Sequence, residues 1–155
     1  MATPDFILAL REKVGTVPLW LSGVTAVVTR GAEVLLVRRA DNGHWTPVTG
    51  IIDPGEQPAA AAEREVLEEA GVVAIARRLA WVQVTEEITY ANGDRSRYID
   101  LVFACEHVSG DPYPADGENS EARWFPLDAL PALSANMAER ITVAVSGQTA
   151  ARFER

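Results

Sequence analysis

The sequence has little cysteine and little positive charge. Its 155 residues include one cysteine, Cys105, so neither a disulfide framework nor a multi-cysteine zinc site is available. Lysine and arginine total 14 against 22 aspartates and glutamates, a net charge of −8, and Lys13 is the only lysine. Nucleic-acid backbones bind clustered basic residues, so we expect no nucleic-acid partner. Metal ions could still bridge an acidic protein to a small polyanionic substrate.

Long hydrophobic runs are also absent. The longest apolar stretches, residues 24–28 and 99–105, are too short to span a membrane. The N-terminus places Asp5 and Glu12 around its apolar residues, which is not typical of a signal peptide. Apolar residues make up 48% of the chain, and a chain of this length buries roughly 70% of its extended surface on folding. We therefore expect one cytoplasmic globular domain, residues 1–155, with no membrane association.

Spacing and turn residues predict alternating helices and strands. Helices are predicted at residues 6–14, 58–70 and 135–145. Strands are predicted at residues 24–29, 33–38, 73–84, 88–90, 97–107 and 122–125. Residues 41–55 and 111–119 predict loops, the first with room for a short strand at residues 45–48. This order favours an α/β (α+β) sandwich with a mixed sheet.

The helix at residues 58–70 carries four glutamates. Glu65, Glu68 and Glu69 are spaced i, i+3 and i+4, so they share one helix face, whereas Glu63 points elsewhere. Arg64 can neutralise part of this cluster but not all of it. Such a face could be an ordinary solvated surface. However, apolar neighbours anchor the helix in a core, and a glycine-rich and proline-rich loop leads directly into it.

Clustered carboxylates suit a hard divalent cation. Mg²⁺ takes oxygen ligands, usually one or two carboxylates completed by waters and substrate phosphates, and Mn²⁺ can substitute. Zinc is disfavoured, because neither His44 nor His107 lies in a metal-binding spacing with another soft ligand. We therefore expect a magnesium site on this helix.

Residues 50–72, GIIDPGEQPAAAAEREVLEEAGV, resemble the Nudix box. Every defined position of the box is filled, by Gly50, Glu56, Arg64, Glu65, Val66, Glu68, Glu69, Gly71 and Val72. The flanks agree, with Trp45-Thr46-Pro47 before the box and Arg123-Trp124-Phe125 in the last predicted strand. The resemblance covers about residues 23–145 and implies the Nudix α/β/α sandwich with a mixed β-sheet. Residues 1–20 form an N-terminal helical extension, expected either to cover the sheet or to join a homodimer interface.

The resemblance implies hydrolysis of a nucleoside diphosphate linked to another moiety, by Mg²⁺-dependent attack of water at phosphorus. Glu65, Glu68 and Glu69 would be metal ligands and catalytic residues, with a further metal contact from the Thr49 backbone carbonyl. Thr49 departs from the glycine common at that position, which affects substrate fit more than the metal. Glu56 and Arg64 would orient the ligands. Gly50 and Gly71 are the glycines of the motif.

Four further positions are substrate candidates, and two carboxylates could assist catalysis. Family members often place phosphate contacts near Arg38 and Arg39, and strand alternation allows at most one of the two to reach the substrate. Trp45 and Tyr90 could stack on a base or belong to the core. Glu118 is preferred over Glu121 as an additional catalytic carboxylate, although either could be an ordinary surface residue.

Other functions were weighed against this one. Ser22 and Ser146 lack the context of a catalytic nucleophile, and Cys105 is expected to be a small core residue. The chief alternative is a catalytically silent Nudix-fold module that senses a nucleotide or binds a protein, but such a module is expected to lose metal carboxylates that this box retains. Tyr90 has a spacing found in some diadenosine polyphosphate hydrolases. NTPs, dNTPs, dinucleoside polyphosphates and ADP-ribose all remain open as substrates.

Overall fold

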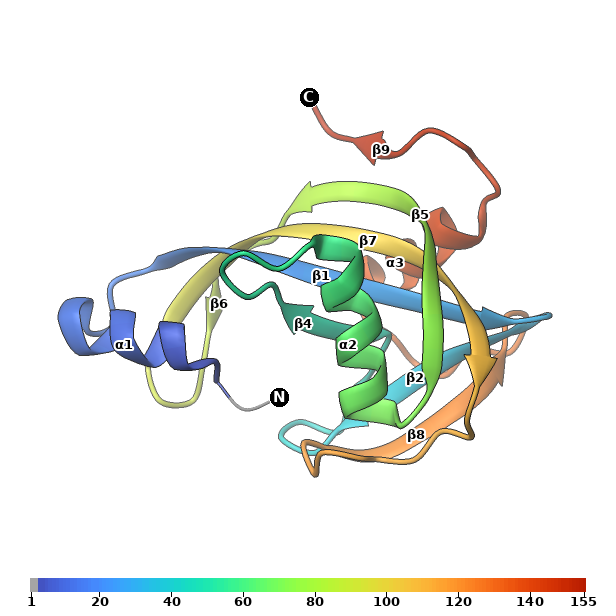
Figure 1. The fold of residues 1–155 in the computed structure, drawn as a ribbon, viewed down its shortest axis with the longest axis horizontal. Coiled ribbons are helices and arrows are strands. Elements are labelled where there is room, and N and C mark those ends of the chain that lie inside the picture. Colours follow the sequence, from blue (N-terminus) through green and yellow to red (C-terminus); the bar gives the residue numbers. More distant parts are fainter. Residues whose placement is uncertain (1–2) are drawn as a thin grey trace.

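The computed structural model describes residues 3–155 and contains three helices and nine strands within that range (Figure 1). The helices are α1 (Asp5–Val14), α2 (Pro58–Ala70) and α3 (Ala135–Val145). The strands are β1 (Leu19–Arg30), β2 (Glu33–Arg39), β3 (Trp45–Thr46), β4 (Val48–Ile51), β5 (Val73–Val84), β6 (Ile88–Thr89), β7 (Arg95–Ser109), β8 (Asn119–Pro126) and β9 (Arg152–Phe153). None of the helices in the described range is long and apolar enough to cross a membrane.

All nine strands belong to one mixed sheet, whose main order is β3-β2-β1-β7-β5-β9. β1 and β7 pair in parallel over eleven residue pairs, whereas β5 and β7 pair antiparallel. β4 also pairs with β1, β6 with β7, and β8 with β2. The mixed sheet and the α+β class expected from the sequence are confirmed.

Two apolar layers lie on opposite faces of this sheet, because side chains alternate along each strand. Val24, Ala26 and Val28 of β1 pack with the inner face of α2. Val27, between them, packs on the other side with α3 through Ile141. The two helices thus flank the sheet (Figure 1). Cys105 is buried at 3% exposure in the α2 layer, as expected.

The loop predicted at residues 41–55 is only partly correct. The short strand allowed for at residues 45–48 is present as β3, but a second strand, β4, pairs antiparallel with β1 through Thr25 opposite Thr49 and Val24 opposite Gly50. The loop prediction relied on glycine, which is depleted in strands, but pairing with a long central strand overrides that local preference. β1 and β7 are also longer than expected, and β9 was not predicted.

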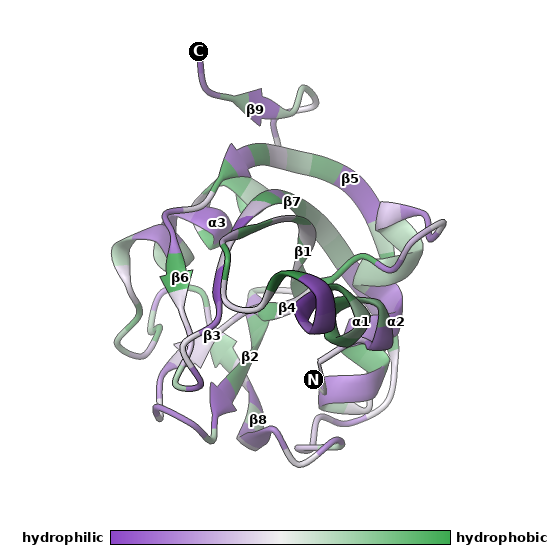
Figure 2. Ribbon diagram, turned by 90° about the vertical axis from the view of Figure 1, so that its left-hand side faces the viewer, coloured by the Kyte–Doolittle hydropathy of each residue, from purple (hydrophilic) through white to green (hydrophobic). Residues whose placement is uncertain are grey.

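The N-terminal helix α1 lies at the end of the molecule that also carries β6 (Figure 1). Ile7 of α1 is 4% exposed and packs with Leu21 of β1 and Tyr98 of β7. The extension therefore covers one end of the sheet, which is one of the two roles considered for it. Figure 2 looks onto this end and shows hydrophilic residues along α2 and at the end of β2.

Candidate metal and substrate site

The helix α2 carries two carboxylates into the protein interior. Glu65 is 1% exposed and Glu69 is 6% exposed, one helical turn apart. Pro58 occupies the first turn, where its missing N–H costs nothing, and Gly71 ends the helix with a φ of 65°. Gly71 donates its backbone N–H to the Leu67 carbonyl at 3.0 Å. These signals set where α2 begins and ends, and its buried residues, Glu65 and Glu69 among them, form the face toward the sheet.

Gly50 allows β4 to approach Glu65 closely. A Cβ at this position would overlap the carboxyl group of Glu65, so any larger residue would displace the side chain or the strand. The two residues are 15 positions apart in sequence, and the contact explains why a glycine is required there.

Arg64 links three carboxylates at one edge of the site. It donates to Glu56 at 2.8 and 2.9 Å, to Glu65 Oε1 at 2.9 Å and to Glu68 Oε2 at 3.1 Å. It also donates to the backbone carbonyl of Ile51 at 3.2 Å. Glu56 in turn accepts from the backbone N–H of Asp53 at 3.1 Å, so the loop, the strand and α2 are joined through one guanidinium.

The two buried carboxylates are only partly satisfied by the protein. Oε2 of Glu65 is buried and has no hydrogen-bond partner among the described residues. Burial raises the pKa of Glu65 to about 7, although Arg64 opposes the shift. Burial likewise raises the pKa of Glu69 to about 7, against a hydrogen bond of 3.1 Å from Asn119. A divalent cation would favour the ionised form of both groups.

Glu68 differs from its two neighbours. It is exposed, and its Oε2 accepts from Nη1 of Arg64, the same nitrogen that donates to Glu65 Oε1, so the guanidinium bridges Glu65 and Glu68. Within residues 3–155, no three His, Cys, Asp or Glu side chains form a ready cluster around one point. Mg²⁺ does not need such a cluster, because waters and phosphates complete its coordination. Glu65 and Glu69, one with a buried oxygen that has no partner, therefore fit this ion.

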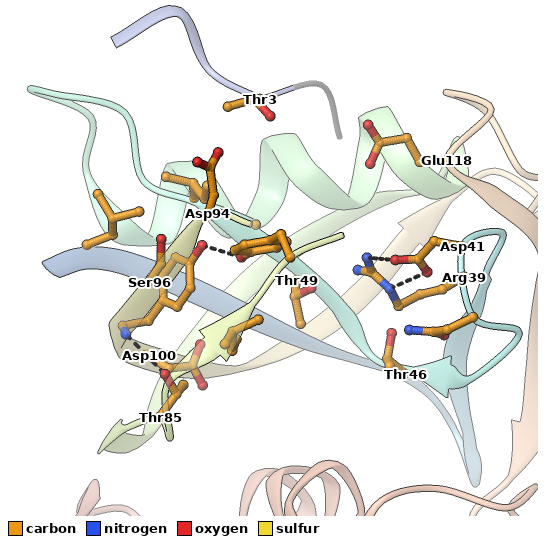
Figure 3. Close-up of a pocket in the computed structure, with 18 of the residues that line it drawn as sticks. Thr3, Arg39, Asp41, Thr46, Thr49, Thr85, Asp94, Ser96, Asp100 and Glu118 are labelled. Carbon is orange, nitrogen blue, oxygen red and sulfur yellow. Dashed lines mark hydrogen bonds and ion pairs between the residues drawn. The ribbon is translucent and has the colours of Figure 1, made fainter. Parts of the chain in front are cut away.

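A cavity of about 760 Å³ begins beside Glu69. The sheet forms its floor and loops form its sides, and α1 and the start of α3 border it. Figure 3 shows Arg39, Asp41 and Glu118 on one side of Thr49, and Asp94 and Ser96 on the other. A cavity of this size accommodates a nucleotide-sized ligand.

Seven of the residues singled out from the sequence line this cavity: Arg39, Trp45, Thr49, Gly50, Glu69, Tyr90 and Glu118. Arg38 lies outside it and pairs with Glu121 at 2.9 Å. Of the two arginines considered as phosphate contacts, Arg39 borders the cavity and Arg38 does not. Of the two carboxylates considered for catalysis, Glu118 borders the cavity and Glu121 does not. Glu65 lies behind Gly50, and Glu56 and Arg64 lie at the edge of the helix.

Arg39 is held by an aspartate close to it in sequence. Its guanidinium donates to Asp41 at 2.7 and 3.0 Å. Arg39 lines the same cavity as Glu69 and Tyr90. Arg39 is thus positioned for an anionic group of a ligand.

The two aromatic candidates have different surroundings. Trp45 packs edge-on against Phe125, with ring centroids 4.8 Å apart, and contacts the α3 layer. Tyr90 is 39% exposed, and its hydroxyl lies 2.6 Å from that of Tyr98. Burial of the hydroxyl raises the pKa of Tyr90. Trp45 therefore also serves the core, while Tyr90 is more accessible to a ligand.

Sequence reasoning missed Asn119 and Asp41, which hold Glu69 and Arg39. It also missed a buried ion pair between Asp100 and Arg140, 3.2 Å apart, that borders the cavity. Most of these partners are far apart in the chain, so no local spacing indicates them. Asp41 is the exception, because an aspartate two residues after an arginine could have been noticed.

The family comparison agrees with this geometry. A model of the NUDIX domain matches residues 20–144. The NAD-capped RNA hydrolase NudC of Pseudomonas aeruginosa is 39% identical over 111 residues, which are 70% of this chain and 37% of that protein. A MutT-like protein of Streptomyces ambofaciens is 33% identical over 79% of this chain and 72% of its own length. The chain belongs to the Nudix family.

A solved structure supports the fold over the whole length. The crystal structure of a UDP-X diphosphatase superposes with a TM-score of 0.68 at 21% identity, and covers 99% of this chain and 75% of its own. At this identity the likeness concerns the fold. The chain spans little more than a third of the Pseudomonas aeruginosa protein, so that protein's activity is not carried over as a fact.

Proposed function

We propose that this protein is a Mg²⁺-dependent hydrolase that cleaves the pyrophosphate bond of a nucleoside diphosphate linked to another moiety. Family membership supports hydrolysis. The name of one similar protein, an NAD-capped RNA hydrolase, indicates a compound in which a nucleoside diphosphate carries a further group.

One observation carries the proposal. Glu65 holds a buried carboxylate oxygen, Oε2, that has no partner among the described residues; it lies one turn from Glu69 and against Gly50, both of which border the cavity. A buried carboxylate oxygen without a partner is costly, and a cation bound there would remove that cost. Arg39 lies on the same side of the cavity as Glu118, so an anionic substrate group would be held next to the carboxylates.

The residues have separable roles in this mechanism. Mg²⁺ held by Glu65 and Glu69 would neutralise phosphate oxygens and lower the pKa of a bound water. Arg64 fixes the orientation of Glu65 and holds Glu68 at the edge of the site. Arg39 binds a phosphate, and Asp41 keeps its guanidinium in place. Glu118 borders the same space and is our candidate for accepting a proton from the attacking water.

A substrate panel tests this function. The purified chain is incubated with NAD, an NAD-capped RNA oligomer, ADP-ribose, a UDP-sugar, a diadenosine polyphosphate and a dNTP, with Mg²⁺, Mn²⁺ or a chelator. We expect release of a nucleoside monophosphate from at least one small compound, only with metal. The net charge of −8 favours free NAD over the capped RNA.

Two variants serve as controls. Glu69→Gln should abolish turnover, whereas Glu139→Gln, on an exposed part of α3, should not change it. No turnover of any compound by a folded protein would contradict the enzymatic function, and unchanged turnover in Glu69→Gln would contradict the assignment of the site. Binding of a nucleotide without turnover would instead favour a catalytically silent sensing module.

A further inference from the structure

The helix α1 lies outside the matched family domain but borders the cavity. The family model begins at residue 20, and α1 ends at Val14. Thr3, Pro4, Ile7 and Arg11 nevertheless line the cavity together with β6 and the start of β7. One wall of the cavity is therefore supplied by a segment that lies before the matched residues.

Arg11 fastens this wall in place. Its guanidinium donates to the backbone carbonyls of Val17 at 2.6 Å and Arg95 at 2.7 Å, and its Nε lies 3.4 Å from Asp94. The side chain is only 11% exposed. Arg11 thus joins α1 to the turn before β7. Its donors are directed at backbone carbonyls, and its side chain is less exposed than that of Arg39, at 11% against 41%, so Arg11 is less accessible to a phosphate.

Part of the cavity wall beside α1 is apolar and aromatic, next to the polar residues Thr3, Asp94 and Ser96. Ile7, Leu21 and Tyr98 form one buried cluster, at 4%, 8% and 9% exposure, and all three border the cavity. Ile51 and Ile88 line the same cavity. Flat, uncharged rings are favoured by such surroundings, because aromatic and aliphatic side chains bury them without desolvating a charge.

The two arginines of the cavity differ in exposure, Arg39 at 41% and Arg11 at 11%. Figure 3 shows Arg39 and Glu118 on one side of Thr49 and Asp94, the partner of Arg11, on the other. Tyr90 lines the cavity, and its hydroxyl lies 2.6 Å from that of Tyr98, which packs with Ile7 of α1. A ligand that spans the cavity would have its anionic part near Arg39 and its neutral part near α1.

We propose that α1 is a specificity element: it forms the wall of a subsite that binds an uncharged ring of the substrate, a nucleobase or a similar heterocycle, through contact with Ile7 and Tyr98. This inference rests on the proposed function for the location of the phosphates. The subsite itself is testable by binding alone, without turnover.

The binding experiment compares ligands with and without a ring. Calorimetry in Mg²⁺ measures the affinity of AMP and UMP, whose rings are uncharged, each against ribose 5-phosphate. We expect at least one ring-bearing ligand to bind ten times more tightly than ribose 5-phosphate to the unmodified chain. Ile7→Asp should remove this preference. Leu8→Asp, a matched change at a position that is 50% exposed on the same helix, should keep it.

Kinetics separate the subsite from a structural role. On a substrate turned over by the unmodified chain, Ile7→Ala should raise KM about tenfold and leave kcat within twofold, because the ring does not take part in the chemistry. Ile7→Val should give an intermediate KM, and this milder change is informative even if Ile7→Asp does not fold. Circular dichroism would establish that each variant retains the fold.

The outcomes distinguish the two proposals. Equal affinity for ring-bearing ligands and ribose 5-phosphate, or equal effects of the Ile7 and Leu8 variants, would overturn the subsite. Turnover that is unaffected at Ile7 would leave the proposed function intact and reject the role of α1. A ring preference lost in Ile7→Asp, in a chain that hydrolyses nothing, would support the subsite and reject the hydrolase.

Discussion

α2 and α3 each bury charged side chains against the same sheet, on opposite faces, but the protein satisfies the two groups differently. On the α3 side, Arg140 donates to Thr25 at 2.7 Å and to Asn136 at 2.8 Å, and pairs with Asp100 at 3.2 Å. Gln83 donates to Asp100 at 3.1 Å. None of these side chains has a buried polar atom without a partner in the described residues.

On the α2 side, Glu65 and Glu69 are equally buried but incompletely paired. Among the described residues Glu65 keeps one oxygen without a partner, and burial raises the pKa of Glu65 and of Glu69 to about 7. In the α3 group, opposite charges and hydrogen bonds are supplied within the chain. The α3 group is therefore expected to stabilise the fold, whereas the α2 group is the one that the proposed function assigns to a metal ion.

The largest expected effect is at the α3 group. Arg140→Met would leave Asp100 buried without its cation, and should lower the free energy of unfolding by about 3–5 kcal/mol. Urea denaturation measures it. The exposed pair between Arg77 and Glu106 provides the control, and Arg77→Met should cost less than about 1 kcal/mol. Similar losses in both variants would mean that the α3 group is not a structural centre.

The double variant Asp100→Leu/Arg140→Met sharpens this test. Replacing both charges by apolar groups removes the unpaired carboxylate, so part of the lost stability should return. If the double variant is less stable than Arg140→Met, the remaining polar partners Thr25 and Gln83 depend on Asp100 more than on the ion pair itself.

The α2 group should respond in the opposite way. Glu65→Gln removes a carboxylate that the protein does not fully pair, so the free energy of unfolding without metal should not fall. The activity should drop at least about 100-fold in kcat/KM, which corresponds to about 2.7 kcal/mol of transition-state stabilisation. A loss of stability as large as that of Arg140→Met would remove the distinction between the two groups.

The sequence predicted the α2 group better than the α3 group, for a physical reason. Glu65 and Glu69 lie one turn apart on a helix with clear end signals, so local spacing places both on one face. Asp100 and Arg140 lie on different elements and meet only through the fold. Helical periodicity contains no information about such a pair.

Because local patterns do not report contacts between distant elements, the predicted strands were less accurate than the predicted helices. The helices at residues 58–70 and 135–145 have the predicted bounds, because capping and periodicity are local. β4 was predicted as loop, because Gly50 disfavours a strand locally, and only the partner strand β1 and the close approach of Glu65 account for it. Asn119 was likewise placed in a loop, but it begins β8 and hydrogen-bonds Glu69.

Metal binding should change the stability less than Arg140→Met does, and only when both carboxylates are present. A ligand that binds only the folded chain at ten times its Kd stabilises it by about 1.4 kcal/mol. We expect Mg²⁺ to raise the thermal unfolding temperature of the unmodified chain and of Ser146→Ala, a surface control, and a chelator to reverse the increase. Glu65→Gln/Glu69→Gln should show no increase. An increase retained in that variant would place the metal elsewhere.

The smallest effect extends the comparison to the helix ends. α3 begins with a capping side chain, since Ser134 accepts a hydrogen bond from the Met137 backbone N–H at 3.3 Å, whereas Gln57 before α2 makes no such bond. Ser134→Ala should cost about 1 kcal/mol in urea denaturation, and Gln57→Ala close to nothing. Equal losses of stability would show that the N-terminus of α2 depends on its preceding residue, Gln57, as much as the N-terminus of α3 depends on Ser134. The expected inequality instead means that α2 is positioned by its buried face and by Arg64, so that its contacts with the loop and β4 determine where the two carboxylates lie.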